Sequence, residues 1–175
     1  MNELGAAVDH VVDRALEPLR RSRVTARVFT LASHVGDFSV VWHVAGLLYA
    51  VGSVDRLKQA LALSLALGIE SLVVNQGVKR LFKRDRPTWH GDDRTRVRKP
   101  RTSSFPSGHA SSATFAAILL ASFTGWPLAA LWVVIAVVVA SSRVVVRIHH
   151  FTDVIGGFVV GGLLGFLALP IIALV

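Results

Sequence analysis

The chain has 175 residues, of which 53% are hydrophobic, and its formal net charge is +8. It contains no cysteine, which excludes disulfides, thiol catalysis and cysteine-ligated zinc. The apolar residues fall in long runs and the mean hydropathy is +0.56, which excludes an ordinary soluble domain and predicts a single membrane-embedded domain over residues 1–175. The basic charge then favours anionic lipid over nucleic acid as the partner.

Residues 1–35 form an amphipathic N-terminal region. Apolar residues recur at helical spacing from Leu4 to Leu19, and acids and arginines fill the opposite face. Such a helix either lies in the membrane interface or packs on the cytoplasmic end of a helical bundle, and the pattern leaves both interpretations open. Residues 24–35 are not expected to cross the membrane, because Arg27 and His34 interrupt a stretch that is already too short.

Five longer apolar segments follow, and they predict an all-α integral membrane bundle of about five transmembrane helices, or six if residues 24–35 also cross. The predicted spans are residues 38–54, 57–82, 107–123, 128–147 and 151–175. A polar loop rich in arginine, residues 83–106, joins the second span to the third and is expected to be an active-site loop.

Two features inside the spans carry further expectations. Glu70 lies in the middle of the second span, where an acid is costly, so it either bonds a neighbouring helix or lines a pocket. Gly157, Gly161 and Gly165 recur at a spacing of four in the last span. Glycines at this spacing let helices approach closely, either within one bundle or between two.

Three polar clusters, residues 79–87, 106–109 and 142–153, fall at span ends that a five-span bundle places on one side of the membrane. Lys79, Arg86 and Arg143 are the candidate phosphate ligands, because guanidinium and ammonium groups match phosphate oxygens. The remaining cations of the loop, Arg84 among them, are interpreted as positive-inside charge.

The second cluster places Ser107 and Gly108 at an expected helix start, where free N–H groups suit a phosphate. An ordinary cap by Ser107 is the alternative. His109 and His149 are the candidate acid–base or nucleophilic groups. Asp153 stands four residues after His149, which on a helix puts both on one face, but His150 is three residues from Asp153 and competes for the same role.

These motifs resemble those of the type 2 phosphatidic acid phosphatase superfamily, membrane lipid phosphatases related to the vanadium haloperoxidases. The sequence reads KRLFKRDRP from Lys79 to Pro87, PSGH from Pro106 to His109, and SRVVVRIHHFTD from Ser142 to Asp153. All three segments match the family pattern in order and spacing. The soluble, vanadate-using haloperoxidase branch does not fit the long apolar spans.

The resemblance implies roles for the residues. His149 would be the nucleophile that forms a phosphohistidine, Asp153 would orient it, and His109 would protonate the leaving group. The implied phosphate ligands are Lys79, Arg86, Ser107, Gly108 and Arg143. No metal or other cofactor is implied.

The implied reaction is metal-independent hydrolysis of a phosphomonoester or diphosphate on a membrane lipid. Polyprenyl phosphosugar phosphates, phosphatidylglycerol phosphate, phosphatidate and polyprenyl diphosphates are the candidate substrates. A non-catalytic protein that binds or transports lipid phosphates on the same fold is the alternative.

The charge distribution predicts which side the site faces. Every lysine and arginine except Arg56 and Lys58 falls on the side of the three clusters. The positive-inside rule therefore predicts an N-terminus and an active site on the cytoplasmic face, in a bacterial plasma membrane.

Overall fold

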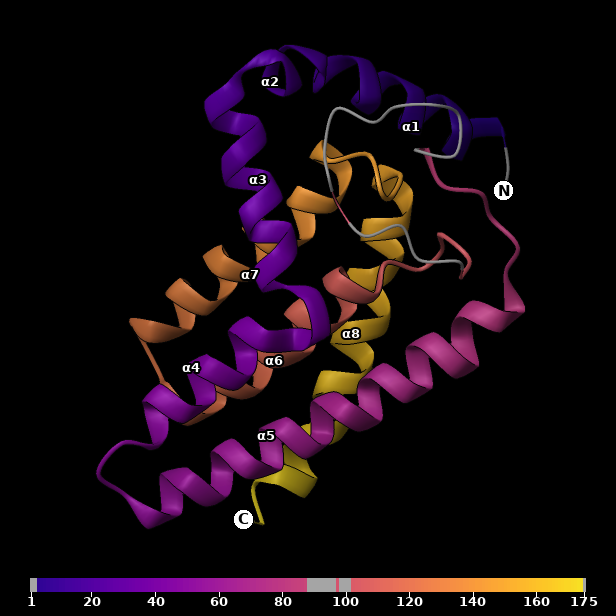
Figure 1. The fold of residues 1–175 in the computed structure, drawn as a ribbon. Helices are drawn as coiled ribbons and strands as arrows, with labels where there is room; N and C mark the ends of the chain where they lie inside the picture. Colours follow the sequence, from indigo (N-terminus) through magenta and orange to yellow (C-terminus); the bar gives the residue numbers. More distant parts are fainter. Residues whose placement is uncertain (1–2, 88–96, 98–101, 175) are drawn as a thin grey trace.

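The computed structural model describes residues 3–87, 97 and 102–174, and the regular secondary structure of this part is all helical, without a strand (Figure 1). Most of the predicted active-site loop, residues 88–96 and 98–101, lies outside the described residues. The longer helices are α1 (Glu3–Ala15), α2 (Glu17–Arg21), α3 (Arg23–Val35), α4 (Val40–Ala50), α5 (Val54–Leu72), α6 (Gly108–Thr124), α7 (Leu128–Val145) and α8 (Phe151–Ile172). The short ones are η1 (Asp37–Ser39), η2 (Val73–Gly77) and η3 (Val78–Leu81). The predicted all-α class is confirmed.

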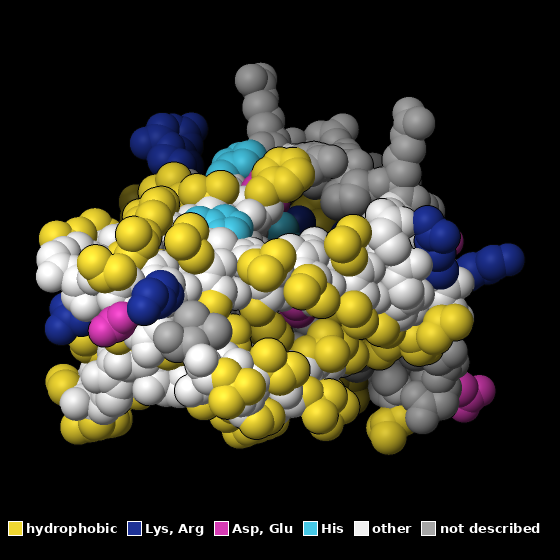
Figure 2. Space-filling model, turned by 90° about the horizontal axis from the view of Figure 1, so that it is seen from below, with side chains coloured by type: hydrophobic (Ala, Val, Ile, Leu, Met, Phe, Trp, Pro, Cys, Tyr) yellow, Lys and Arg dark blue, Asp and Glu magenta, His cyan; other side chains and the backbone are white. Residues whose placement is uncertain are grey.

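Among the described residues, three helical segments are long and apolar enough to cross a bilayer: Val54–Leu81, Leu128–Val145 and Phe151–Ile172. They carry many exposed valines, leucines and isoleucines, which is typical of a lipid-facing surface. Figure 2 shows hydrophobic side chains spread over one face of the molecule, with lysines and arginines toward its edges. The chain is therefore a membrane protein, as its composition predicted.

The first predicted span, residues 38–54, is divided differently in the structure. Helix α4 has only 11 residues, about 16 Å of helix, which is too short for a core of about 30 Å. Helix α3 precedes it, and the two meet at a kink where Phe38 and Ser39 have positive φ. Ser33 of α3 bonds Arg143, whereas Tyr49 of α4 bonds the Phe123 carbonyl at 3.1 Å, so the two helices together run along the bundle.

Helices α6 and α8 pack closely through the glycines predicted for close packing. A Cβ added to Gly157 would lie 2.5 Å from the Ser107 carbonyl oxygen, and one on Gly161 would lie 2.1 Å from the Ser111 carbonyl oxygen. A Cβ on Gly165 would lie 2.9 Å from Ile118. These glycines therefore face α6 of the same bundle. Of the two interpretations, close packing within one bundle is the one observed.

The N-terminal helices lie across the end of the bundle where α7 ends and α8 begins (Figure 1). Asp9 of α1 accepts hydrogen bonds from the Thr152 N–H and hydroxyl, both at 2.8 Å, and so caps α8. Arg20 donates to the Val145 carbonyl at 3.0 Å and to the Val144 carbonyl at 3.1 Å, at the end of α7. Of the two interpretations of residues 1–35, packing on the bundle end is the one observed: Val12 of α1 packs against a core cluster, while Leu4, Val8 and Val11 stay exposed.

Replacing Gly161 with alanine should destabilise the protein, because the new Cβ cannot coexist with the Ser111 carbonyl unless α6 shifts. We expect a loss of about 2 kcal/mol, measured by thermal unfolding in detergent. Gly68→Ala is the matched control: it lies in exposed α5 surface with no atom within 4 Å of an added Cβ, and it should be neutral or gain about 0.5–1 kcal/mol. Equal stability of the two variants would contradict this account of α6–α8 packing.

Candidate active site

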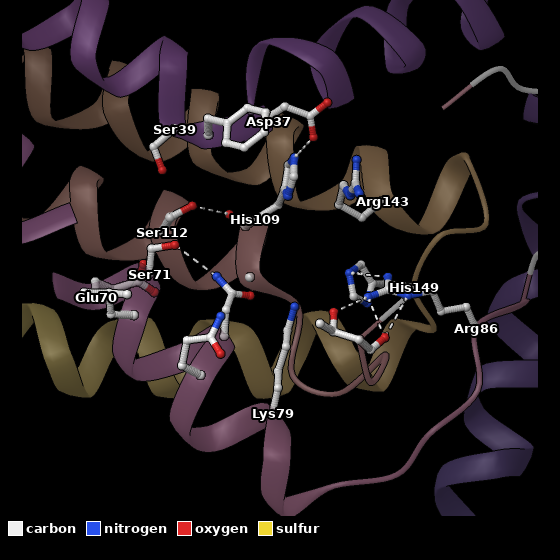
Figure 3. Close-up of a pocket in the computed structure, with 17 residues that line it drawn as sticks. Asp37, Ser39, Glu70, Ser71, Lys79, Arg86, His109, Ser112, Arg143 and His149 are labelled. Carbon is white, nitrogen blue, oxygen red and sulfur yellow. Dashed lines mark hydrogen bonds and ion pairs between the residues drawn. The ribbon is translucent and has the colours of Figure 1, made fainter. Parts of the chain in front are cut away.

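A cavity of about 370 Å3 opens at the end of the bundle where the three clusters converge. Its walls include most of the predicted site residues: Lys79, Arg86, Gly108, His109, Arg143 and His149 (Figure 3). Ser107 and Asp153 are fully buried and do not line it. The structure thus brings together residues that are separated by up to 70 positions in the sequence, as expected for a five-span bundle that puts the three clusters on one side.

His149 lies in the turn between α7 and α8, with its backbone N–H bonded to the Arg143 carbonyl at 3.0 Å. Its Nδ1 lies 3.5 Å from Asp153 Oδ2 and 3.3 Å from Ser104 Oγ. Its Nε2 lies 3.1 Å from Arg86 NH1. Because a guanidinium can only donate, Nε2 must be the acceptor, so the proton sits on Nδ1 and the Nε2 lone pair points toward a cation of the cavity.

The predicted pairing of His149 with Asp153 is present, but its geometry differs from the expected helix face. His149 precedes α8, and Asp153 lies in the first turn of that helix, where its Oδ2 accepts from the His150 N–H at 2.9 Å. The two side chains meet because the chain folds over the helix start. The rival His150 points elsewhere, with its Nε2 3.3 Å from the Asp85 carbonyl oxygen.

The three predicted phosphate ligands are buried cations held by different parts of the chain. Helix α5 gives way to the π-helical turn η2 and then to η3, which carries Lys79. Arg86 NH1 donates to the Ile148 carbonyl at 3.0 Å and NH2 to the Ser103 carbonyl at 3.1 Å. Arg143, in the last turn of α7, donates to the Ser33 hydroxyl. Buried cations that converge on one cavity create a strong site for an anion.

Ser107 begins α6, with its hydroxyl accepting from the Ala110 N–H at 3.4 Å. Its own N–H donates to the Asp153 carbonyl at 2.9 Å. The cap that formed the alternative interpretation of Ser107 is therefore observed. Gly108 faces the cavity, since an added Cβ would lie 3.5 Å from Lys79 Nζ.

His109 is paired with an acid that the motifs did not indicate. Its Nε2 lies 3.1 Å from Asp37 Oδ1 and 3.2 Å from the Ser33 carbonyl oxygen (Figure 3). Burial alone raises the pKa of Asp37, but the hydrogen bond and charge of His109, with Arg143, outweigh it and leave the pKa below its usual value. A charged Asp37 stabilises a protonated His109 ring, the state that a general acid needs.

The surroundings of the cavity leave the His149 ring neutral and the Arg86 guanidinium charged. Burial lowers the pKa of His149 well below its usual value and outweighs the opposing effect of its hydrogen bond to Asp153, so the ring is neutral at pH 7. Burial also lowers the pKa of Arg86, to about 10, so this guanidinium stays charged. A neutral imidazole beside a cation can act as a nucleophile toward a bound phosphate.

A chain of charges links α1 to the histidine turn. Asp9 Oδ2 pairs with Arg84 NH2 at 2.5 Å, and Arg84 NH1 pairs with Asp153, which contacts His149. Arg84 is thus a structural partner of the site rather than the loop charge expected from the sequence. Local spacing gives no signal for this role, because Asp9 is far from Arg84 in sequence. Ser104, whose hydroxyl donates to Asp153, could have been suspected because it lies next to the second motif.

The sequence profile of the PAP2 superfamily matches residues 59–174. The chain belongs to this superfamily. The match contains all three motifs and begins after Asp9 and Asp37, so these two acids lie outside it. The resemblance inferred from the motifs is confirmed, and the protein is a membrane lipid phosphatase of this superfamily.

Individual relatives agree with the family assignment. A decaprenylphosphoryl-5-phosphoribose phosphatase of Mycolicibacterium smegmatis is 39% identical over 127 residues, which cover 71% of this chain and 67% of the relative. The crystal structure of a transmembrane PAP2-type phosphatidylglycerolphosphate phosphatase from Bacillus subtilis is 25% identical, with a TM-score of 0.70 over 97% of this chain and 87% of the other. LpxE of Aquifex aeolicus, 20% identical, shares the fold with a TM-score of 0.75 over 97% and 96% of the two chains.

The link through Arg84 predicts that Asp9→Asn weakens catalysis from outside the cavity. Without the Asp9 charge, Arg84 holds Asp153 less firmly, and we expect kcat to fall about tenfold, or about 1.4 kcal/mol, with little change in KM. Asp13→Asn on the same helix is the control, because Asp13 pairs with Arg20 and Arg147 instead. Equal losses of kcat in both variants, tracking equal losses of thermal stability, would show that α1 acts only as a structural clamp.

Proposed function

We propose that the protein removes a terminal phosphate from a membrane lipid through a phosphohistidine formed on His149, without a metal ion. The observation that carries this proposal is the His149 ring, neutral and fixed by Asp153 through Nδ1, with its Nε2 lone pair directed at the Arg86 end of the cation cluster. A protein that only binds or transports lipid phosphates needs the cations but not an oriented imidazole.

In the first step, the phosphate oxygens take the place of His149 as the acceptor of the Arg86 hydrogen bond, and Lys79 and Arg143 share the negative charge. Nε2 then attacks phosphorus while the bond from phosphorus to the lipid oxygen breaks. The leaving oxygen takes a proton from the His109 ring, whose protonated form the nearby Asp37 carboxylate stabilises. The proton on Nδ1 of His149 remains directed toward Asp153 and stabilises the positive ring.

In the second step, the His109 ring, now neutral, accepts a proton from a water molecule as the water oxygen attacks phosphorus. The bond between phosphorus and Nε2 breaks, inorganic phosphate leaves, and His149 returns to its neutral form. His109 ends protonated, so the two steps balance and the site is ready for another substrate.

The substrate class follows from the position of the cavity. It opens among helices with apolar outer faces, so a phosphate carried on a lipid reaches it from the bilayer. The similarity to a decaprenylphosphoryl-5-phosphoribose phosphatase makes a polyprenyl phosphosugar phosphate the first candidate, and phosphatidylglycerol phosphate, phosphatidate and polyprenyl diphosphate follow.

The site faces the cytoplasm of a bacterial cell in this proposal. The cation-rich N-terminal helices and the histidine turn lie at one end of the bundle, and the loop between α4 and α5, near Arg56 and Lys58, lies at the other. The positive-inside rule supports an orientation in which the end with more cations faces the cytoplasm.

The proposed function predicts phosphate release from a panel of these lipid phosphates by purified protein in detergent with excess chelator. His149→Ala should lower kcat roughly a thousandfold or more, because the nucleophile is lost. His150→Ala is the matched control, because it keeps the backbone N–H that donates a hydrogen bond to Asp153, and it should retain most of the activity. Hydrolysis that survives His149→Ala would overturn the mechanism, and a folded protein that cleaves no lipid of the panel would favour the binding or transport alternative.

The proposed orientation predicts the labelling of single cysteines introduced into this cysteine-free chain. In intact cells, an impermeant thiol reagent should label Asp55→Cys, at the exposed start of α5, and should reach Arg21→Cys, at the exposed end of α2, only after permeabilisation. The reverse pattern would place the active site outside.

A further inference from the structure

The cavity has a second end that the proposed chemistry does not use. Glu70, Ser71 and Ser112 line it away from His149 and Arg86 (Figure 3). We infer that this end binds hydroxyl groups, so that the substrate carries a sugar between its terminal phosphate and its lipid chain. The inference rests on the proposed function, since it names the head group of the lipid phosphate that is hydrolysed.

Glu70 sets the preference of this end. Its side chain belongs to a residue that is only 3% exposed, and its Oε1 accepts a hydrogen bond from the Ser111 hydroxyl of α6. A buried carboxyl group needs hydrogen-bond partners around it, and a sugar hydroxyl can donate to its oxygens or accept from its protonated form. The hydroxyls of a sugar are donors, whereas the ester groups of phosphatidate only accept and the second phosphate of a diphosphate adds negative charge. Glu70 therefore favours a sugar over either competitor.

Asn75 joins the two ends of the cavity. Its amide donates to the Ser71 hydroxyl at 3.0 Å, and its Oδ1 would lie 3.3 Å from a Cβ on Gly108, next to Lys79 Nζ at 3.5 Å from the same point. The π-helical turn η2, which contains Asn75, interrupts the regular helix at this level, as such turns often do at functional sites. A phosphate held by Lys79 thus places the next atoms of its substrate beside an amide and two hydroxyls.

The rim of the cavity offers an apolar path for the rest of the substrate. Phe38 and Leu72 line the same cavity and are 77% and 63% exposed. The walls therefore offer cations, hydroxyl-binding groups and an apolar rim. A lipid that carries a phosphosugar phosphate presents a phosphate, hydroxyls and hydrocarbon, one for each kind of surface.

The test compares substrates and needs no variant to begin. The wild-type protein is assayed with a polyprenylphosphoryl phosphoribose, with the same lipid lacking both ribose hydroxyls, and with phosphatidate. Loss of the hydroxyls removes the hydrogen bonds that they make to Glu70 and Asn75, so we expect kcat/KM to fall roughly 10- to 100-fold. Phosphatidate should be at least as poor a substrate as the dideoxy lipid.

The variant Glu70→Gln then assigns the effect to this end of the cavity. It should reduce the ratio of kcat/KM for the hydroxylated lipid to that for the dideoxy lipid by about tenfold, because an NH2 donor replaces one of the two carboxyl oxygens. Asp55→Asn, an acid on the exposed start of the same helix, should leave the ratio unchanged.

Equal kcat/KM for the hydroxylated and dideoxy lipids, or a ratio that Glu70→Gln leaves unchanged, would overturn the hydroxyl site while the phosphatase function stands. Failure to hydrolyse any of the three lipids would instead count against the proposed function. The two failures are therefore distinguishable.

Discussion

The fully buried carboxylate of Asp153 is the constraint on which the site depends. An unpaired charge in this environment costs several kcal/mol, so the chain must supply partners from distant segments. Ser104 donates at 2.5 Å, the His150 N–H donates at 2.9 Å, and Arg84 and His149 complete the shell. Because these partners come from the loop before α6 and the turn before α8, satisfying one carboxylate fixes the turn that carries the nucleophile.

The same constraint extends outward to both ends of the chain. Arg84 forms ion pairs with both Asp153 and Asp9, and Asp9 also accepts from Thr152, so the N-terminal helix is held against the start of α8. The glycine face of α8 lets α6 approach until the Ser107 N–H reaches the Asp153 carbonyl at 2.9 Å. The packing of the apolar helices and the geometry of the polar site therefore depend on each other, through the small residues of α8 and the paired charges at its first turn.

The cavity combines two kinds of polar surface that answer different chemical needs. Cations at one end meet the charge that a phosphate carries and that spreads over its oxygens during transfer. At the other end, an acid and neutral side chains match hydroxyl groups and give poor support to a second anion. A membrane enzyme that receives several phosphorylated lipids from the same bilayer can thus select among them by what lies next to the phosphate, since the phosphate itself is common to all.

The sequence by itself determined the membrane class and the three motifs with their cations, because these depend on composition and on spacings within a few residues. Local spacing left His149 and His150 open, and it was the family resemblance that favoured His149. It placed Glu70 correctly as an unusual acid and left its two roles open; the structure shows both, a bond to α6 and a place in the cavity wall. Only the tertiary structure decided the partners Asp37, Arg84 and Asp9, the kink between α3 and α4, and the position of His149 before α8 rather than on it. These features depend on which helix ends meet, and a buried charge is satisfied by whatever group the fold brings near, at any distance along the chain.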